Sequence, residues 1–171
     1  MDISSSREPL STQSVDAIAV GATKSFADEL VELDAAFGGE LVPALSARKF
    51  SGAAGTSVRL PTFGKLTAKE LIIVGVGERT EADLARAARH AGRQARAAGF
   101  GSLALSLGTV DNPQLTREGL AAGNYSYDIY KAEDGQTEAL QSVVFVGDVD
   151  AATIAKAAIR AKWQSFARDL V

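Results

Sequence analysis

Residues 70–99 read ELIIVGVGERTEADLARAARHAGRQARAAG: a short apolar run, a glycine turn and a long alanine-rich stretch. The apolar run over 70–76 predicts a strand. Thr80 can cap a helix with acidic residues in its first turn, and this helix should continue to Gly99. A strand, a tight turn and a helix in this order form the repeating unit of an α/β sheet.

The segments on either side continue the alternation. Apolar runs predict strands at 15–20, 56–60, 102–107 and 143–146. Helical spacing of apolar residues predicts helices at 26–37, 41–49, 113–125 and 150–171. Because only a turn-rich segment separates the strands at 56–60 and 70–76, we expect these two to pair antiparallel. The sequence therefore predicts a three-layer α/β/α sandwich with a mixed, mostly parallel sheet.

Composition excludes several classes of protein. The chain has 171 residues, is 46% hydrophobic and 23% charged, and carries a formal net charge of −3, as expected for a globular domain with no global attraction for nucleic acid. The absence of cysteine excludes disulfides and thiolate metal sites. The sequence has neither a secretory signal nor an apolar segment that could span a bilayer, so we expect a cytoplasmic protein with no membrane partner. Residues 1–13 are polar and predict a flexible tail.

The glycine turn after the strand at 70–76 has two interpretations. Gly75 and Gly77 lie where a phosphate-binding loop would bring backbone amides to an anion. Thr80 occupies the place of the third glycine of such a loop, and Glu78 and Glu81 put negative charge beside it. A plain tight turn and a nucleotide-binding loop both remain open from the residues alone.

Four arginines mark a candidate partner surface on the helix that follows. At roughly 100° per residue they fall within an arc of about 80°, opposite the alanines that would face the sheet. These residues are Arg86, Arg89, Arg93 and Arg96. The arc can be a solvated face or a contact for an acidic protein. It could also contact nucleic acid, which we do not expect.

Other side chains offer little chemistry. His90 is the single histidine, so an imidazole-rich zinc site cannot form within the chain, and we expect this residue to lie in solvent. The cluster Tyr125, Tyr127 and Tyr130 could line a ligand site, but aromatic residues after a helix usually seal a core edge. The sequence contains no G-x-S-x-G motif of a serine nucleophile and no cluster of carboxylates of the kind that holds catalytic metals. We therefore assign no catalytic, metal-binding or cofactor-binding residue.

Three segments resemble the N-terminal region of the leucyl (cytosol) aminopeptidase family. The first is GKLTAKELIIVGVGERTEADLARAARHAG at 64–92, similar to the family's strand, glycine turn and alanine-rich helix. The second is REGLAAGNYSYDIYK at 117–131, similar to its helix that ends in an aromatic run. The third is ARDLV at 167–171, similar to the segment that leads into the catalytic domain.

The resemblance implies one part of a larger enzyme. Residues 14–149 would form the N-terminal domain, and 150–171 the connecting helix toward a catalytic domain. The whole enzyme would be a cytoplasmic homohexamer that removes N-terminal amino acids from peptides with two divalent metals, manganese or zinc. The family's Asn-Thr-Asp-Ala-Glu-Gly-Arg-type metal motif has no counterpart here, so no catalytic residue is carried over.

The same resemblance implies the role of the domain and an alternative to it. Family members use this domain for subunit contacts and for access to the active sites, so its expected partners are its own catalytic domain and further subunits. The fold implied is similar to that of macro domains, which bind ADP-ribose. A stand-alone module for a nucleotide or ADP-ribose is therefore the alternative function.

Overall fold

The computed structural model describes residues 1–108, 118–120, 122–123 and 140–147. A six-stranded sheet in the order β1-β6-β5-β2-β4-β3 forms its centre. The strands are β1 (Asp2–Ser6), β2 (Ala17–Ala22), β3 (Ser57–Pro61), β4 (Glu70–Gly75), β5 (Ser102–Ser106) and β6 (Ser142–Val146). The helices are the 3-10 turn η1 (Leu10–Thr12), α1 (Phe26–Glu29), α2 (Val31–Ala36), α3 (Leu41–Ala47) and α4 (Glu81–Ala97).

The sheet is mixed and mostly parallel, which confirms the predicted fold class. Strand β2 pairs in parallel with β4 on one side and with β5 on the other, so Ala19 lies between Ile72 and Leu105. Only β3 is antiparallel to its neighbour β4, as the turn-rich segment between them predicted. The carboxyl ends of β2, β4 and β5 therefore meet at one edge of the sheet.

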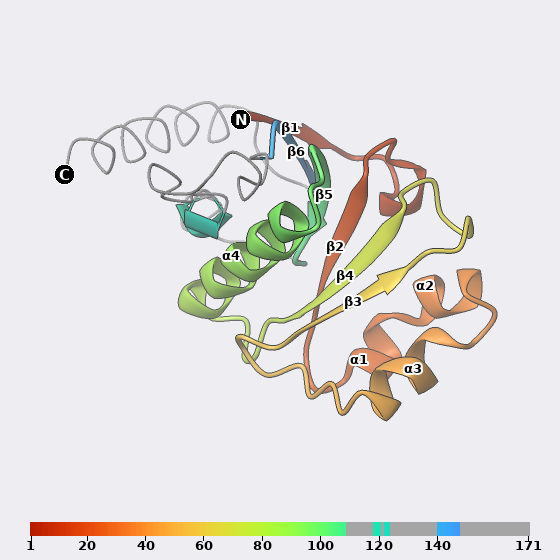
Figure 1. The fold of residues 1–171 in the computed structure, drawn as a ribbon. Helices are drawn as coiled ribbons and strands as arrows, with labels where there is room; N and C mark the ends of the chain where they lie inside the picture. The colour runs from red at the N-terminus through yellow and green to blue at the C-terminus, as the bar shows by residue number, and fades with distance from the viewer. Residues whose placement is uncertain (109–117, 121, 124–139, 148–171) are drawn as a thin grey trace.

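Helices cover both faces of the sheet (Figure 1). On one face, Ile72 and Val74 of β4 belong to the core that contains the small residues of α4. On the other face, Leu71 and Ile73 pack in the core with residues of α1, α2 and α3. Because alternate residues of β4 are buried on opposite faces, the strand is apolar along its whole length, as is usual in a sheet covered on both sides.

Helix α4 begins as its sequence predicted. The Thr80 hydroxyl accepts a hydrogen bond from the Asp83 amide at 3.2 Å, which satisfies one of the free amides of the first turn. The helix packs close to the sheet through small residues, since Ala87, Ala88 and Ala91 are fully buried. None of the helices in the described part of the chain is long and apolar enough to cross a membrane.

The amino-terminal segment differs from the prediction of a flexible tail over 1–13. Residues Asp2–Ser6 form the edge strand β1, parallel to β6, and the Asp2 amide donates to the Gln141 carbonyl at 2.6 Å. This part of the prediction was wrong because ladder hydrogen bonds come from the backbone, and an edge strand needs no apolar pattern when one side faces solvent.

The helix predicted over 26–37 is divided in two. It breaks at Leu30 into α1 and α2, and Gly38 and Gly39 then adopt positive φ and end it, as expected. The helix predicted over 41–49 is confirmed as α3, with Pro43 in its first turn. The helices predicted at 113–125 and 150–171 lie mostly outside the described residues; 118–120 and 122–123 are helical.

Candidate functional site

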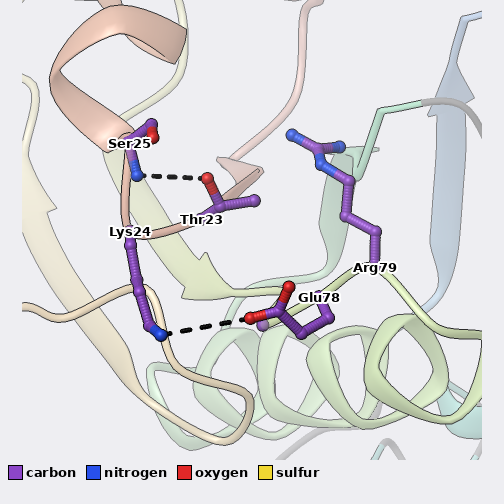
Figure 2. A pocket seen from close by; sticks show the side chains of 6 residues that line it. Thr23, Lys24, Ser25, Glu78 and Arg79 are labelled. Atoms are coloured by element: carbon purple, nitrogen blue, oxygen red, sulfur yellow. Dashed lines mark hydrogen bonds and ion pairs between the residues drawn. The ribbon is translucent and has the colours of Figure 1, made fainter.

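A pocket opens at the carboxyl ends of β2 and β4, the edge where α/β sheets usually bind ligands. Its volume is about 390 Å³, and it is lined by Thr23, Lys24, Ser25, Gly77, Glu78 and Arg79. Figure 2 shows these side chains around the loops that follow the two strands. The glycine turn singled out in the sequence forms one wall of this pocket.

Backbone amides of the glycine turn are already used by the protein's own carbonyls. The Gly75 amide donates to Thr56 at 2.8 Å, and the Gly77 amide donates to Gly52 at 3.0 Å. The Val76 amide donates to Ala22, also at 3.0 Å. A phosphate-binding loop needs such amides to point at the ligand. The geometry therefore favours the tight-turn interpretation over a nucleotide-binding loop.

The glycine at 75 is explained by the close approach of another loop. A Cβ atom at Gly75 would lie 2.0 Å from the Ala53 carbonyl oxygen and 2.4 Å from the Thr56 hydroxyl. The loop between α3 and β3 thus packs directly on the end of β4. Glycine allows this backbone contact, and protein fills the space beside Gly75.

The bonds of Arg79 connect the carboxyl ends of β2, β4 and β5 at the pocket. Its guanidinium donates to the Leu107 carbonyl at 3.1 Å, just after β5, and pairs with the Glu29 carboxylate at 3.3 Å. Glu29 in turn accepts from the hydroxyl and the amide of Thr23, just after β2, at 2.5 and 2.7 Å. Arg79 itself follows β4 and has a positive φ of 60°.

The Glu29 carboxylate is held in its charged form. Burial raises the pKa of Glu29, but the bonds from Thr23 and the bond and charge of Arg79 outweigh this effect. The pKa therefore lies below its ordinary value of 4.5. A carboxylate that stays ionised at neutral pH, and whose oxygens are occupied, is a structural partner rather than a general acid.

The outer rim of the pocket is solvated. Lys24 and Glu78 face each other at 4.0 Å with side chains that are 80% and 84% exposed (Figure 2). An ion pair this exposed contributes little to stability or to binding. Among the described residues, no group of three or more His, Asp or Glu side chains is placed to hold a metal ion.

The four predicted surface arginines do not remain together. Arg86, Arg89 and Arg93 are exposed on α4. Arg96 is only 9% exposed, so it is not part of the exposed surface that was predicted. Arg96 lies at the edge of the arc nearest Ala85, at roughly 100° per residue. Gly119, in the helical residues 118–120, packs against α4 on that side near Ala85, because a Cβ at Gly119 would lie 2.0 Å from the Ala85 carbonyl oxygen.

His90 was expected in solvent and is half-buried. Its Nδ1 lies 3.3 Å from the Arg93 guanidinium. Burial, followed by the charges of Arg93, Arg89 and Arg86, lowers the pKa of His90 below 6.5, so the ring is neutral at pH 7. The tyrosine cluster at 125, 127 and 130 lies outside the described residues.

Sequence reasoning missed one cluster at the opposite edge of the sheet. Asp16 Oδ2 accepts from the Ser102 hydroxyl at 2.8 Å and from the Gly101 and Ser102 amides, while Oδ1 accepts from Lys69 at 2.9 Å. These bonds join the beginnings of β2, β4 and β5. An aspartate directly before a buried strand was the available signal, but its partners are 53 and 86 residues away in sequence.

Comparison with known proteins identifies the family. Residues 17–134 match the family described as "Cytosol aminopeptidase family, N-terminal domain". The chain belongs to the cytosol aminopeptidase family. This confirms the resemblance found in the sequence, although the match by itself concerns one domain of the family's members.

Curated relatives in this family are much longer than the chain. A "Probable cytosol aminopeptidase" of Geobacter sp. (strain M21) is 43% identical over an alignment of 115 residues that covers 60% of this chain and 22% of the relative. One from Leifsonia xyli subsp. xyli is 35% identical over an alignment of 170 residues that covers 95% of this chain and 33% of the relative. The chain thus spans a third or less of these cytosol aminopeptidases.

A solved structure shares the fold. A mutant of tomato leucine aminopeptidase superposes with a TM-score of 0.79 at 20% identity, covering 95% of this chain and 35% of that one. At this identity the likeness concerns the fold alone. It agrees with the α/β architecture and with a match to one part of a larger aminopeptidase chain.

Proposed function

We propose that these 171 residues are the non-catalytic N-terminal domain of a leucyl (cytosol) aminopeptidase. The whole enzyme would remove N-terminal amino acids from peptides in the cytoplasm. The observation that carries the proposal is the match of 17–134 to a family described as an N-terminal domain. The 22% and 33% shares of the curated relatives add to it, since most of each relative lies outside the match.

The metals of the proposed enzyme would belong to its catalytic domain. Two divalent ions, manganese or zinc, would activate water and polarise the scissile carbonyl there. The residues described here do not fit such a centre: no cluster of three or more potential ligands occurs among them, and the carboxylates of Glu29 and Asp16 are used in structural bonds. No catalytic step is therefore assigned to this chain.

The domain would contribute contacts rather than chemistry. Its expected partners are its own catalytic domain and other subunits of a homohexamer, where it would also shape access to the active sites. The exposed face of α4 with Arg86, Arg89 and Arg93 is one candidate for such a contact. Surface charge selects partners and orientation more than it adds affinity, which suits this role.

Peptide hydrolysis by the isolated chain tests the non-catalytic assignment. With manganese or zinc added, we expect no release of leucine from leucyl peptides above the rate without protein. A full-length cytosol aminopeptidase assayed in the same buffer is the positive control. Turnover that follows the chain through repurification would contradict the proposal.

The source gene gives a second, independent test. We expect the reading frame to continue beyond the codon for Val171 into a segment that encodes the lysine- and aspartate-rich metal motifs of the family. A stop codon at that position would instead favour a stand-alone domain.

The alternative, a module for a nucleotide or ADP-ribose, has weaker support. The pocket lies at the appropriate edge of the sheet, but the amides of Gly75, Val76 and Gly77 are occupied and Glu78 adds negative charge. Calorimetric titration with ADP-ribose should give no binding heat at high micromolar concentration. Saturable heat that is lost on substitution of a pocket residue would restore this alternative.

A further inference from the structure

One face of α4 carries positive charge that no acidic side chain in the described part of the chain pairs with. Arg86, Arg89 and Arg93 are all exposed, and none of them forms an ion pair with another described residue. These three residues form the α4 basic surface. Their combined charge also acts on His90, whose pKa is lowered by burial and then by the same three arginines.

A surface of the opposite sign lies on α1 and α2. Asp28 and Glu32 are exposed and, in the described part of the chain, form no ion pair or side-chain hydrogen bond. Val31 lies between them in sequence and is 59% exposed, so this surface also presents an apolar side chain. These three residues form the α1–α2 acidic surface.

The two surfaces cannot meet within one molecule. Helix α4 packs on one face of the sheet, and α1 and α2 pack on the other (Figure 1). Arg86, Arg89 and Arg93 extend over about 10 Å along α4, at 1.5 Å per residue. Asp28 and Glu32 lie on the two short helices α1 and α2, on either side of the break at Leu30.

We propose that the α4 basic surface of one copy binds the α1–α2 acidic surface of a second copy. The contact is heterologous, because different surfaces of the two copies meet, so it forms a ring or an open chain rather than a two-fold dimer. The proposal rests on the subunit-contact role of the proposed function, and it names the surfaces. Guanidinium groups bind carboxylates with directional hydrogen bonds, and Val31 supplies the apolar centre.

Charge complementarity favours a second copy over nucleic acid. The chain has a formal net charge of −3, so its overall field repels a polyanion. The α1–α2 acidic surface is present on the same chain and is therefore always available at the concentration of the protein. Because exposed ion pairs are individually weak, the contact should be weak in the isolated chain and strongly salt-dependent.

Charge reversal with rescue tests the proposal on the chain as it is. One variant carries Arg89→Glu with Arg93→Glu, and the other carries Asp28→Lys with Glu32→Lys. Sedimentation equilibrium at high protein concentration and low salt should show self-association of the wild type. Each variant alone should associate at least about tenfold more weakly, a change readily resolved in an association constant.

A mixture of the two variants should recover association, since each then meets a surface of opposite charge. Lys49→Glu is the matched control: it reverses the charge of an exposed residue that belongs to neither surface. This variant should associate like the wild type. Circular dichroism checks that every variant is folded. Raising the salt from about 20 mM to about 500 mM should dissociate the wild type, because the Debye length then falls several-fold.

Three results would overturn the proposal: a wild type that is monomeric at low salt, reversed variants that associate as the wild type does, or a mixture that shows no recovery. Salt-dependent binding of duplex DNA that Arg89→Glu with Arg93→Glu removes, without self-association, would assign the basic surface to nucleic acid. Peptide hydrolysis is not measured here, so failure of this contact is distinct from failure of the aminopeptidase assignment.

Discussion

Phe63 lies in a backbone conformation that is unfavourable for an aromatic residue. Its φ is 52°, Gly64 follows with φ 77°, and the Lys65 amide donates to the Thr62 carbonyl, as in a type I′ turn. Asn-Gly is the preferred pair in such a turn. The ring is 82% exposed and therefore gains little from burial.

Phe63→Asn should therefore stabilise the fold. The left-handed conformation costs an ordinary residue about 1–2 kcal/mol, and asparagine tolerates it better, so we expect a gain of about 1 kcal/mol in the free energy of unfolding. Urea denaturation measures the change. Phe63→Leu removes the ring but keeps the strain, so it should leave stability nearly unchanged; equal effects of the two substitutions would refute the explanation.

Asp16 should make stability depend on acidity. The bonds from Lys69 and then Ser102 lower the pKa of Asp16 below its ordinary value of 3.8. The unfolded state therefore binds the proton more readily, so the stabilisation is complete above 3.8 and is lost as the pH falls through the lower pKa of the folded state.

Asp16→Asn should cost about 2 kcal/mol at neutral pH, since it removes charge-assisted hydrogen bonds. The difference in the free energy of unfolding between this variant and the wild type should shrink when urea denaturation is repeated at pH values from about 7 down to about 3. Asp28→Asn changes an exposed carboxylate and serves as the control: it should have little effect on stability at about pH 7 or at about pH 3. If the stability lost on Asp16→Asn stays the same from about pH 7 to about pH 3, the charge of Asp16 does not contribute to stability.

At the scale of elements, α4 is covered on two sides rather than one. Its small residues face the sheet, and Gly119 and Gly123 bring a second helical segment against the backbone of Ala85 and Arg89. A Cβ at Gly119 would lie 2.0 Å from the Ala85 carbonyl oxygen. This segment thus packs directly on the backbone of α4.

Gly119→Ala should therefore destabilise the protein although alanine is the better helix former. Overpacking costs about 1–3 kcal/mol, against a propensity gain of about 1 kcal/mol. The melting temperature should fall. Gly101→Ala is the control, because a Cβ there would have its nearest neighbour at 3.8 Å and should be tolerated. A Gly119→Ala variant at least as stable as the wild type would contradict the close contact.

Local patterns predicted the elements that they control and missed the contacts between distant segments. Thr80 before two acids predicted the start of α4, and the apolar run over 70–76 predicted the central strand β4. Nothing local marks Asp2–Ser6 as a strand, because β6 supplies its pairing from the far end of the sequence. The same holds for Arg79, whose partner Glu29 lies 50 residues earlier on another loop.

At the scale of the whole molecule, the groups of the glycine turn that could bind an anion are used by the fold itself. The turn amides bind neighbouring carbonyls, and Arg79 spans the strand ends with its charge paired to Glu29. The glycine turn could be located from the sequence, but its function could not, since this depends on where the loop around Ala53 packs. A domain of this kind would serve its enzyme through its surfaces.

Domain exchange tests this central claim most directly. The chain replaces the matching segment of the Leifsonia xyli relative, which is 35% identical to it over 170 residues. The equivalent segment of the Geobacter relative, placed in the same host, is the control for exchange itself. The account predicts that the hybrid assembles and hydrolyses leucyl peptides when the control hybrid does. An active control beside an inactive or unassembled hybrid would contradict it.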